Sequence, residues 1–274
     1  MRFGPGAGDS RDIEDRRGKG RGVPASLGIG GFVVLAVLSL IFKENFFALM
    51  DGGASGESQL TSSAEEEALR DHVNRVTTDL QNVWERELPR QAKLPYKRSV
   101  VVLYRDSTPT ACGHGEAATG PFYCPADQKV YLDLSFFAQL SQRFGAPGDA
   151  AQAYVIAHEI GHHIQNLTGA ERRMRIEARQ NPSQKNALSV KLELQADCYA
   201  GVWAKSTQER GILEAGDLEE ALRCAEAIGD DTLQQKSRGR VRPETFTHGS
   251  AAERARWFRR GFDSGLMSVC DTFQ

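Results

Sequence analysis

Two histidines flank a glutamate in the stretch AYVIAHEIGHHIQNLTG, residues 153–169, in the pattern H-E-x-x-H. On an α-helix, His158 and His162 lie on the same face, about 6 Å apart along the axis. Two imidazoles so placed can bind one Zn²⁺, which needs a third protein ligand and an open position to do chemistry. Glu159 is placed to act as the general base at that open position. A solvated polar helix face is the alternative, but the apolar neighbours favour a buried metal site, because buried charges need partners.

A candidate third ligand stands in a second apolar stretch, KLELQADCYAGVWA, residues 191–204. Glu193 and Asp197 are four residues apart there and share one helix face. We interpret Glu193 as the third metal ligand and Asp197 as the carboxylate that accepts the free ring N–H of a metal-bound histidine, which fixes the tautomer. An exposed acidic pair would be ordinary, but apolar residues frame this one. Two buried carboxylates and two buried histidines are explained together if they surround one cation.

The motif H-E-I-G-H at 158–162, followed by E-L-Q-A-D at 193–197, resembles the gluzincin metallopeptidases, whose ligands are H-E-x-x-H and a later E-x-x-x-D. A closer resemblance is to the bacterial neutral zinc metallopeptidase family. It is carried by the opening RDIEDRRG and by GPFYCPADQKVYLDLSFF, YVIAHEIGHHIQ, LELQADCYAGVW, EEALRCAEAIGDD and FTHGSAAERARWFRRGFDSG. The resemblance implies a membrane-anchored zinc peptidase, with one Zn²⁺ per chain.

Two further residues are candidates for the same site. His248 stands just before the last predicted helix, where it can donate a hydrogen bond to the oxyanion of a tetrahedral intermediate. His248 and Arg254 resemble the H-P-x-x-x-x-R element of membrane gluzincins, with Gly249 in place of the proline, which implies a supporting role for Arg254 beside the ligands. An equally good interpretation is that His248 is a loop histidine that satisfies local backbone groups. His163 is rotated by about 100° from His162 and is interpreted as a neighbour of the site, not as a ligand.

These residues predict a zinc-dependent endopeptidase that hydrolyses peptides or proteins with a zinc-activated water. Two other classes of protein remain open: a catalytically silent envelope scaffold that keeps zinc for stability, and a membrane-tethered adaptor in which the two helices are only core. Glu159 argues for hydrolysis, because a structural zinc site does not need a base. The formal net charge of −2 over 274 residues gives no reason to expect nucleic acid as a partner.

The N-terminal part of the chain predicts a single-pass protein of the cell membrane. Residues 1–22 are rich in Gly, Arg and Asp and are predicted to form a disordered cytoplasmic tail. Residues 23–42, VPASLGIGGFVVLAVLSLIF, carry no charge and are long enough to cross a bilayer of about 30 Å. Basic residues precede this run, so the positive-inside rule places everything after it outside the cytoplasm. A cleaved signal peptide is the alternative. Residues 43–63 are interpreted as a linker and 64–274 as the metallopeptidase domain.

The five cysteines agree with an oxidising compartment. Cys112 and Cys124 bracket a turn-rich loop, CGHGEAATGPFYC, and can form a short disulfide. A second zinc site that includes His114 is the alternative. The pairing of the other three is not predicted, and one of them must stay free or pair between chains: Cys198, Cys224 and Cys270.

The elements around these residues predict an α+β fold, in which a mainly helical, zincin-like domain with a small β-sheet follows one transmembrane helix. Residues 99–105 and 129–134 have the composition of strands, and an edge of their sheet can pair with an extended peptide. Asp149 is predicted to cap the helix that carries H-E-x-x-H, and Gly169 to end it. The charged segment after Gly169 is interpreted as a solvated connection, with a mobile flap over the cleft as the alternative.

Overall fold

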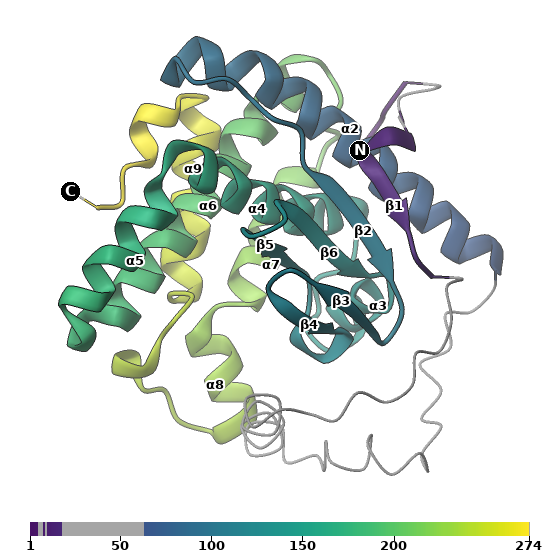
Figure 1. The fold of residues 1–274 in the computed structure, drawn as a ribbon. Coiled ribbons are helices and arrows are strands. Elements are labelled where there is room, and N and C mark those ends of the chain that lie inside the picture. Colours follow the sequence, from purple (N-terminus) through teal and green to yellow (C-terminus); the bar gives the residue numbers. More distant parts are fainter. Residues whose placement is uncertain (5–7, 9, 18–62, 274) are drawn as a thin grey trace.

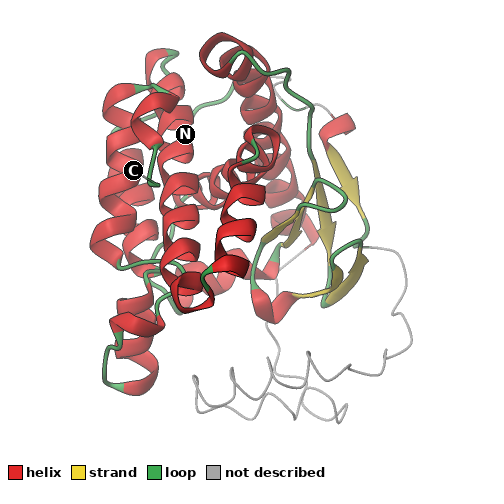
Figure 2. Cartoon of the chain, turned by 60° about the vertical axis from the view of Figure 1, so that its left-hand side comes forward, coloured by secondary structure: helices red, strands yellow, loops and turns green. Residues whose placement is uncertain are grey.

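Helices and strands occupy separate parts of the molecule (Figure 1, Figure 2). The computed structural model describes residues 1–4, 8, 10–17 and 63–273. The described fold is mainly helical with a small sheet, which confirms the predicted α+β class. Its α-helices are α2 (Ser63–Ala92), α3 (Ser135–Gln142), α4 (Asp149–Thr168), α5 (Ala170–Gln180), α6 (Lys185–Glu209), α7 (Asp217–Ala227), α8 (Asp230–Arg238) and α9 (Ala251–Ser264).

The main sheet has the strand order β1-β2-β6-β5, in which β1, β2 and β6 are parallel and β5 is antiparallel to β6. The predicted strands at 99–105 and 129–134 are confirmed as β2 and β6. Residues of β2 alternate between the main core and a smaller apolar cluster on the other face, so the strand is apolar throughout. A two-stranded ribbon, β3-β4, stands apart from this sheet. The strands are β1 (Ile13–Asp15), β2 (Val100–Tyr104), β3 (Ser107–Thr110), β4 (Gly113–Glu116), β5 (Phe122–Cys124) and β6 (Lys129–Asp133).

The N-terminal segment takes part in the fold where the structure describes it. Ser10–Asp12 forms a 3₁₀ turn, and β1 pairs with β2 at the edge of the sheet. The prediction of a disordered tail is therefore wrong for these residues. Low apolar content suggested disorder, but strand pairing and ion pairs hold the segment, such as Asp12 with Arg98 at 2.7 Å.

The predicted membrane span, residues 23–42, and the linker up to residue 62 lie outside the described residues. Within the part of the chain that is described, no helix combines the length and the apolar character needed to cross a bilayer.

The helix α4 packs against α2, α6 and α7, and most of its side chains are buried. Gly161 allows α6 to approach closely, since a Cβ atom at this position would lie 2.8 Å from the carbonyl oxygen of Ala196. Gly261 has the same role between α9 and α6, where a Cβ atom would lie 2.0 Å from the carbonyl oxygen of Cys198. These two close contacts bring polar side chains of α4, α6 and α9 within hydrogen-bond distance of one another.

The observed ends of α4 agree in part with those predicted from the sequence. Gly169 ends the helix in the left-handed conformation (φ 75°), as predicted. Asp149 is not the cap: Gly148 precedes the helix, and Asp149 is the first helical residue. The Asp149 carboxylate instead accepts a hydrogen bond from the Met1 ammonium at 2.7 Å. The charged segment after Gly169 forms the helix α5, most of whose side chains are exposed.

Two disulfides stabilise the described domain. Cys112–Cys124 forms as predicted, which removes these thiols from any zinc site with His114. Cys198–Cys270 joins α6 to a 3₁₀ turn near the C-terminus, and Cys224 is buried and unpaired.

Candidate metal centre

The three predicted ligands converge between α4 and α6. His158, His162 and Glu193 each offer one ligand atom, and these atoms lie within 4.8 Å of one another. The Nε2 atom of His158 is 3.1 Å from Glu193 Oε2, and the Nε2 atom of His162 is 3.6 Å from Glu193 Oε1. One helix turn separates the two histidines, and the close approach at Gly161 brings the glutamate opposite them.

The other nitrogen of each imidazole has an oxygen partner. His158 donates from Nδ1 to Asp197 Oδ1 at 2.7 Å. His162 Nδ1 lies 2.8 Å from Gln165 Oε1, and the amide nitrogen of Gln165 donates to Leu192, so this oxygen must accept. Both rings therefore carry their proton on Nδ1 when neutral, which leaves the Nε2 atoms, 3.1 and 3.6 Å from Glu193 oxygens, as the atoms that could bind a metal.

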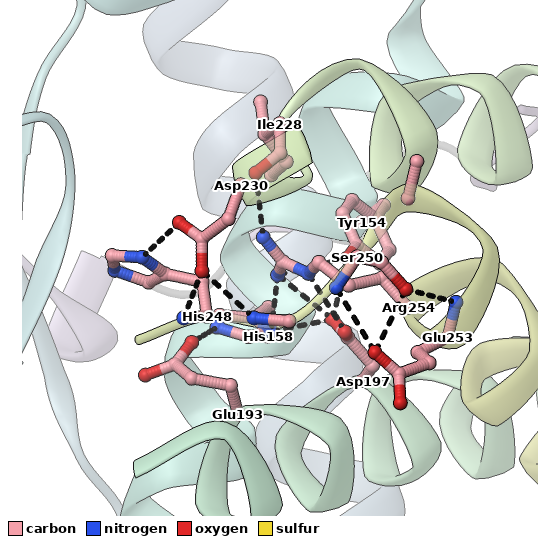
Figure 3. Close-up of polar contacts among 12 residues, drawn as sticks. Tyr154, His158, Glu193, Asp197, Ile228, Asp230, His248, Ser250, Glu253 and Arg254 are labelled. Atoms are coloured by element: carbon pink, nitrogen blue, oxygen red, sulfur yellow. Dashed lines mark hydrogen bonds and ion pairs between the residues drawn. The ribbon is translucent and has the colours of Figure 1, made fainter. Parts of the chain in front are cut away.

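Asp197 is the centre of a buried polar network (Figure 3). It accepts hydrogen bonds from His158, from the hydroxyl of Tyr154 at 2.5 Å, and from Arg254 at 2.9 and 3.0 Å. Arg254 is only 3% exposed and also donates to Tyr154 at 3.2 Å. Arg254 comes from α9, so three helices fix the carboxylate that orients His158.

Electrostatics in this cluster favour a bound cation. Burial opposes a charge on His158, but the carboxylates of Asp197 and Glu193 outweigh it and raise the pKa of His158 to about 10. Burial likewise opposes ionisation of Asp197, yet Arg254 and His158 lower its pKa to about 2. The neighbouring histidines also lower the pKa of Glu193. Both carboxylates are therefore anionic at neutral pH, and a metal ion would displace the proton that His158 otherwise binds.

His248 lies near His158 and Glu193, as Figure 3 shows. It lines the same cleft as these residues, and it has a carboxylate partner. Its Nδ1 atom is 3.2 Å from Asp230 Oδ1, and this hydrogen bond raises the pKa of His248. Asp230 Oδ2 accepts from the backbone N–H groups of Thr247, His248 and Gly249 at 2.7 to 3.0 Å. Asp230 thus fixes both the loop and the imidazole. A loop histidine that only satisfied local backbone groups would not need this carboxylate partner.

One cleft of about 520 Å³ is lined by the three candidate ligands together with His248 and Arg254. Glu159 is on its wall and is 8% exposed. The strand β5 contributes Phe122 and Tyr123, and further apolar walls come from Phe136, Phe144, Val155, Leu192, Ile228 and Leu233. The cleft therefore combines an apolar lining with a small set of convergent polar groups, as small-molecule and peptide sites do.

Three supporting residues were not predicted. Tyr154 and Gln165 lie one turn from His158 and His162 on the same helix, so helical spacing alone could have drawn attention to them. Asp230 is 18 residues from His248 and gives no local signal. His163 is not a ligand: its ring bonds Tyr123 and the Lys97 carbonyl, and burial lowers its pKa to about 4.

The donor set fits zinc. Two imidazole nitrogens and one carboxylate are the protein ligands of open catalytic zinc sites, in which the fourth position takes water or substrate. All three ligands line the cleft, so a fourth position would face it. A second acidic group, Asp149 with Asp217 and Glu220, lies elsewhere, and the Met1 ammonium is bound there.

The sequence matches the family described as "Putative neutral zinc metallopeptidase" over residues 1–273, and the chain belongs to this family. It is 45% identical over 282 aligned residues to the uncharacterized protein YpfJ of Escherichia coli (strain K12), covering 98% of this chain and 97% of YpfJ. It is 44% identical over 202 residues to the uncharacterized protein Rv2575 of Mycobacterium tuberculosis, covering 70% and 66% of the two chains. No solved structure matches the chain at a significant level.

Proposed function

We propose that the protein is a zinc-dependent endopeptidase of the cell envelope that hydrolyses peptide bonds of extracytoplasmic proteins or peptides. The main support is the presence, in one cleft, of an open donor set of two histidines and a glutamate beside a second glutamate, Glu159. A structural zinc site closes all four positions with protein ligands and does not need a neighbouring base. The family membership supports the same class of activity.

Glu159 is the general base of the proposed reaction. Zinc, when bound by His158, His162 and Glu193, supplies Lewis acidity that polarises the substrate carbonyl and lowers the pKa of water. Glu159 accepts a proton from the attacking water and delivers it to the leaving amine. Its backbone follows that of His158 directly on α4, so the helix fixes the base relative to the ligands.

His248 is the proposed donor to the oxyanion of the tetrahedral intermediate. Because Asp230 holds Nδ1, the Nε2–H of His248 is available to a substrate in the cleft. The raised pKa of His248 favours its cationic form, which strengthens a hydrogen bond to a developing negative charge. Asp197 and Arg254 act through His158, by holding its ring in one orientation.

The cleft favours an extended peptide with apolar side chains. β5 is an outer strand of the described sheet, so one of its edges can pair with the backbone of a substrate. The aromatic and aliphatic walls favour bulky apolar residues near the scissile bond. The two disulfides favour an oxidising compartment, which agrees with action outside the cytoplasm at the cell membrane.

The test uses the purified full-length chain in detergent. We expect one zinc ion per chain and hydrolysis of an unfolded protein substrate, which stops when a chelator removes the metal and returns when zinc is added. Stoichiometric zinc without hydrolysis of any peptide in a diverse library would instead favour the scaffold. Absence of zinc would exclude both the peptidase and the zinc scaffold and leave the adaptor.

A further inference from the structure

The described residues of the N-terminal segment, 1–4, 8 and 10–17, contact both the sheet and the helices of the domain that carries the cleft. β1 adds a parallel strand to β2, and the N–H of Arg16 continues the pairing by donating to the Leu103 carbonyl at 2.8 Å. Asp12, only 2% exposed, accepts two hydrogen bonds from Arg98 at 2.7 and 3.0 Å. The segment thus covers the edge of β2 and forms the outer strand at the end of the sheet opposite β5.

The start of this segment reaches the helical body. The Met1 ammonium lies 2.7 Å from Asp149 and 3.2 Å from Asp217, which are the first residues of α4 and α7. The Met1 side chain is 1% exposed and lines an apolar cavity with Tyr154 and Trp203. These contacts are independent of the strand pairing, and they place the segment against both the sheet and the helices.

The end of this segment is held beside the start of α2. Arg17 donates to Glu66 at 2.9 Å and to Glu67 at 2.8 Å, and both glutamates are in the first turns of α2. Glu66 is 7% exposed and also accepts from Arg105 at 2.6 Å. Arg17 and α2 are therefore in direct contact, although 45 residues, 18–62, separate Arg17 from Ser63 in the chain.

We infer that the N-terminal segment is a built-in edge strand of the catalytic domain and lies on the same side of the membrane as the cleft. A bilayer has a hydrocarbon core of about 30 Å, so a single crossing between Arg17 and Ser63 would pull apart every contact just described. The described residues on the two sides of positions 18–62 therefore belong to one body. This topology differs from the one that charge bias around residues 23–42 predicts, which places the N-terminus in the cytoplasm and the domain outside.

Cysteine labelling in intact cells tests the sidedness. Gly4→Cys adds a thiol at an exposed position where a Cβ atom meets nothing within 4 Å, and Ala252→Cys adds one at an exposed position on α9. A membrane-impermeant maleimide should label both variants to the same extent, and the two disulfides lead us to expect labelling without permeabilisation. The unmodified chain is the control, since its single free thiol, Cys224, is buried. Labelling of Ala252→Cys alone, with Gly4→Cys reached only after permeabilisation, would overturn the inference.

A charge exchange tests the contact itself. In the full-length chain, Asp12→Arg should lower the urea midpoint of unfolding, because it places a second cation at a buried position beside Arg98. Adding Arg98→Asp should restore part of the loss, although it removes the pair of Arg98 with Glu85, and a merely unstructured segment would show no such recovery. Arg2→Ala, whose side chain is 80% exposed, is the matched control and should leave the midpoint unchanged. An Asp12→Arg variant as stable as the parent would show that the segment is not docked.

Discussion

At the scale of single residues, the site depends on which imidazole nitrogen carries the proton. Asp197 can only accept, and Gln165 Oε1 is required to accept because the amide nitrogen of the same side chain donates to Leu192. With Nδ1 held in this way, both histidines direct Nε2 toward Glu193, and His158 has only to lose its Nε2 proton before that atom can bind a metal. The candidate ligands are preorganised, so folding, and not binding of a metal, would meet the cost of orienting them.

Substitutions of Glu193, Glu159 and Asp197 should distinguish the metal ligand, the general base and the residue that orients His158. Glu159→Gln should keep full zinc and lose about 100-fold to 10,000-fold in turnover, because it removes only the base. Glu193→Gln should lose zinc, because it removes the anionic ligand. Asp197→Asn should weaken zinc binding by about 10- to 100-fold. Zinc content and hydrolysis of an unfolded protein measure all three.

The matched control is Glu177→Gln, an exposed position on α5 that should change neither quantity. A Glu159→Gln variant as active as the parent would exclude the proposed mechanism, whatever the zinc content of the other variants.

Substitutions at the His248–Asp230 pair should lower turnover without loss of metal. His248→Ala removes the proposed oxyanion donor and should cost about 100-fold in kcat, with little change in KM. Asp230→Asn keeps an oxygen acceptor for the backbone but removes the charge that favours the imidazolium, so a smaller loss of about 10-fold is expected. Steady-state kinetics and zinc content measure the effect, and Gln235→Ala, an exposed change on α8, is the control. Loss of zinc in His248→Ala would instead make this histidine a metal ligand.

At the scale of elements, prediction from sequence was successful where the signal is local. The helices that carry the i,i+4 pairs His158–His162 and Glu193–Asp197, the strands β2 and β6, and the Cys112–Cys124 loop each depend on residues close in the chain. β1 is only three residues long, and its partner strand lies more than 80 residues away in the chain. Neither hydrophobic periodicity nor composition therefore predicts this strand. Asp230 and the Cys198–Cys270 pair depend in the same way on long-range packing.

The approach of α4 to α6 should be sensitive to one added methyl group. Replacing glycine by alanine in an exposed helix usually stabilises it, by about 1 kcal/mol. Gly161→Ala should do the reverse and cost about 1–3 kcal/mol, because its Cβ atom would meet the backbone of α6 at 2.8 Å. Zinc affinity should fall with stability, since Glu193 is on the displaced helix. Urea unfolding and a zinc titration measure both effects.

Ala68→Gly, at an exposed position of α2, gives the size of the helix-propensity effect alone. A Gly161→Ala variant more stable than the parent would show that α6 moves aside without cost, and that the close helix contact does not determine the ligand geometry.

At the scale of the whole molecule, contacts distant in sequence hold the sheet, the helices and the two termini together. The N-terminal segment joins the edge of the sheet to the starts of α4 and α7. Near the other terminus, Gln195 donates to the Cys270 carbonyl at 3.0 Å, and Thr272 donates to the Lys191 carbonyl at 2.6 Å. The helix α6, which carries Glu193 and Asp197, is therefore also held by residues near the C-terminus.

The Cys198–Cys270 disulfide should contribute most to stability among the covalent links. It closes a loop of 72 residues, against 12 for Cys112–Cys124, and loop-closure entropy then gives about 4 kcal/mol for the longer loop. The double variant Cys198→Ala, Cys270→Ala should lower the free energy of unfolding by about this amount. It should also loosen α6 beside Asp197, so zinc should be lost at a lower urea concentration. Urea unfolding with and without reductant measures the contribution of the disulfide. The control is Cys224→Ala, whose stability should depend on reductant as that of the parent chain does. Equal stability of the oxidised and reduced parent would show that hydrogen bonds from α6 to the C-terminal residues, not the disulfide, hold this helix.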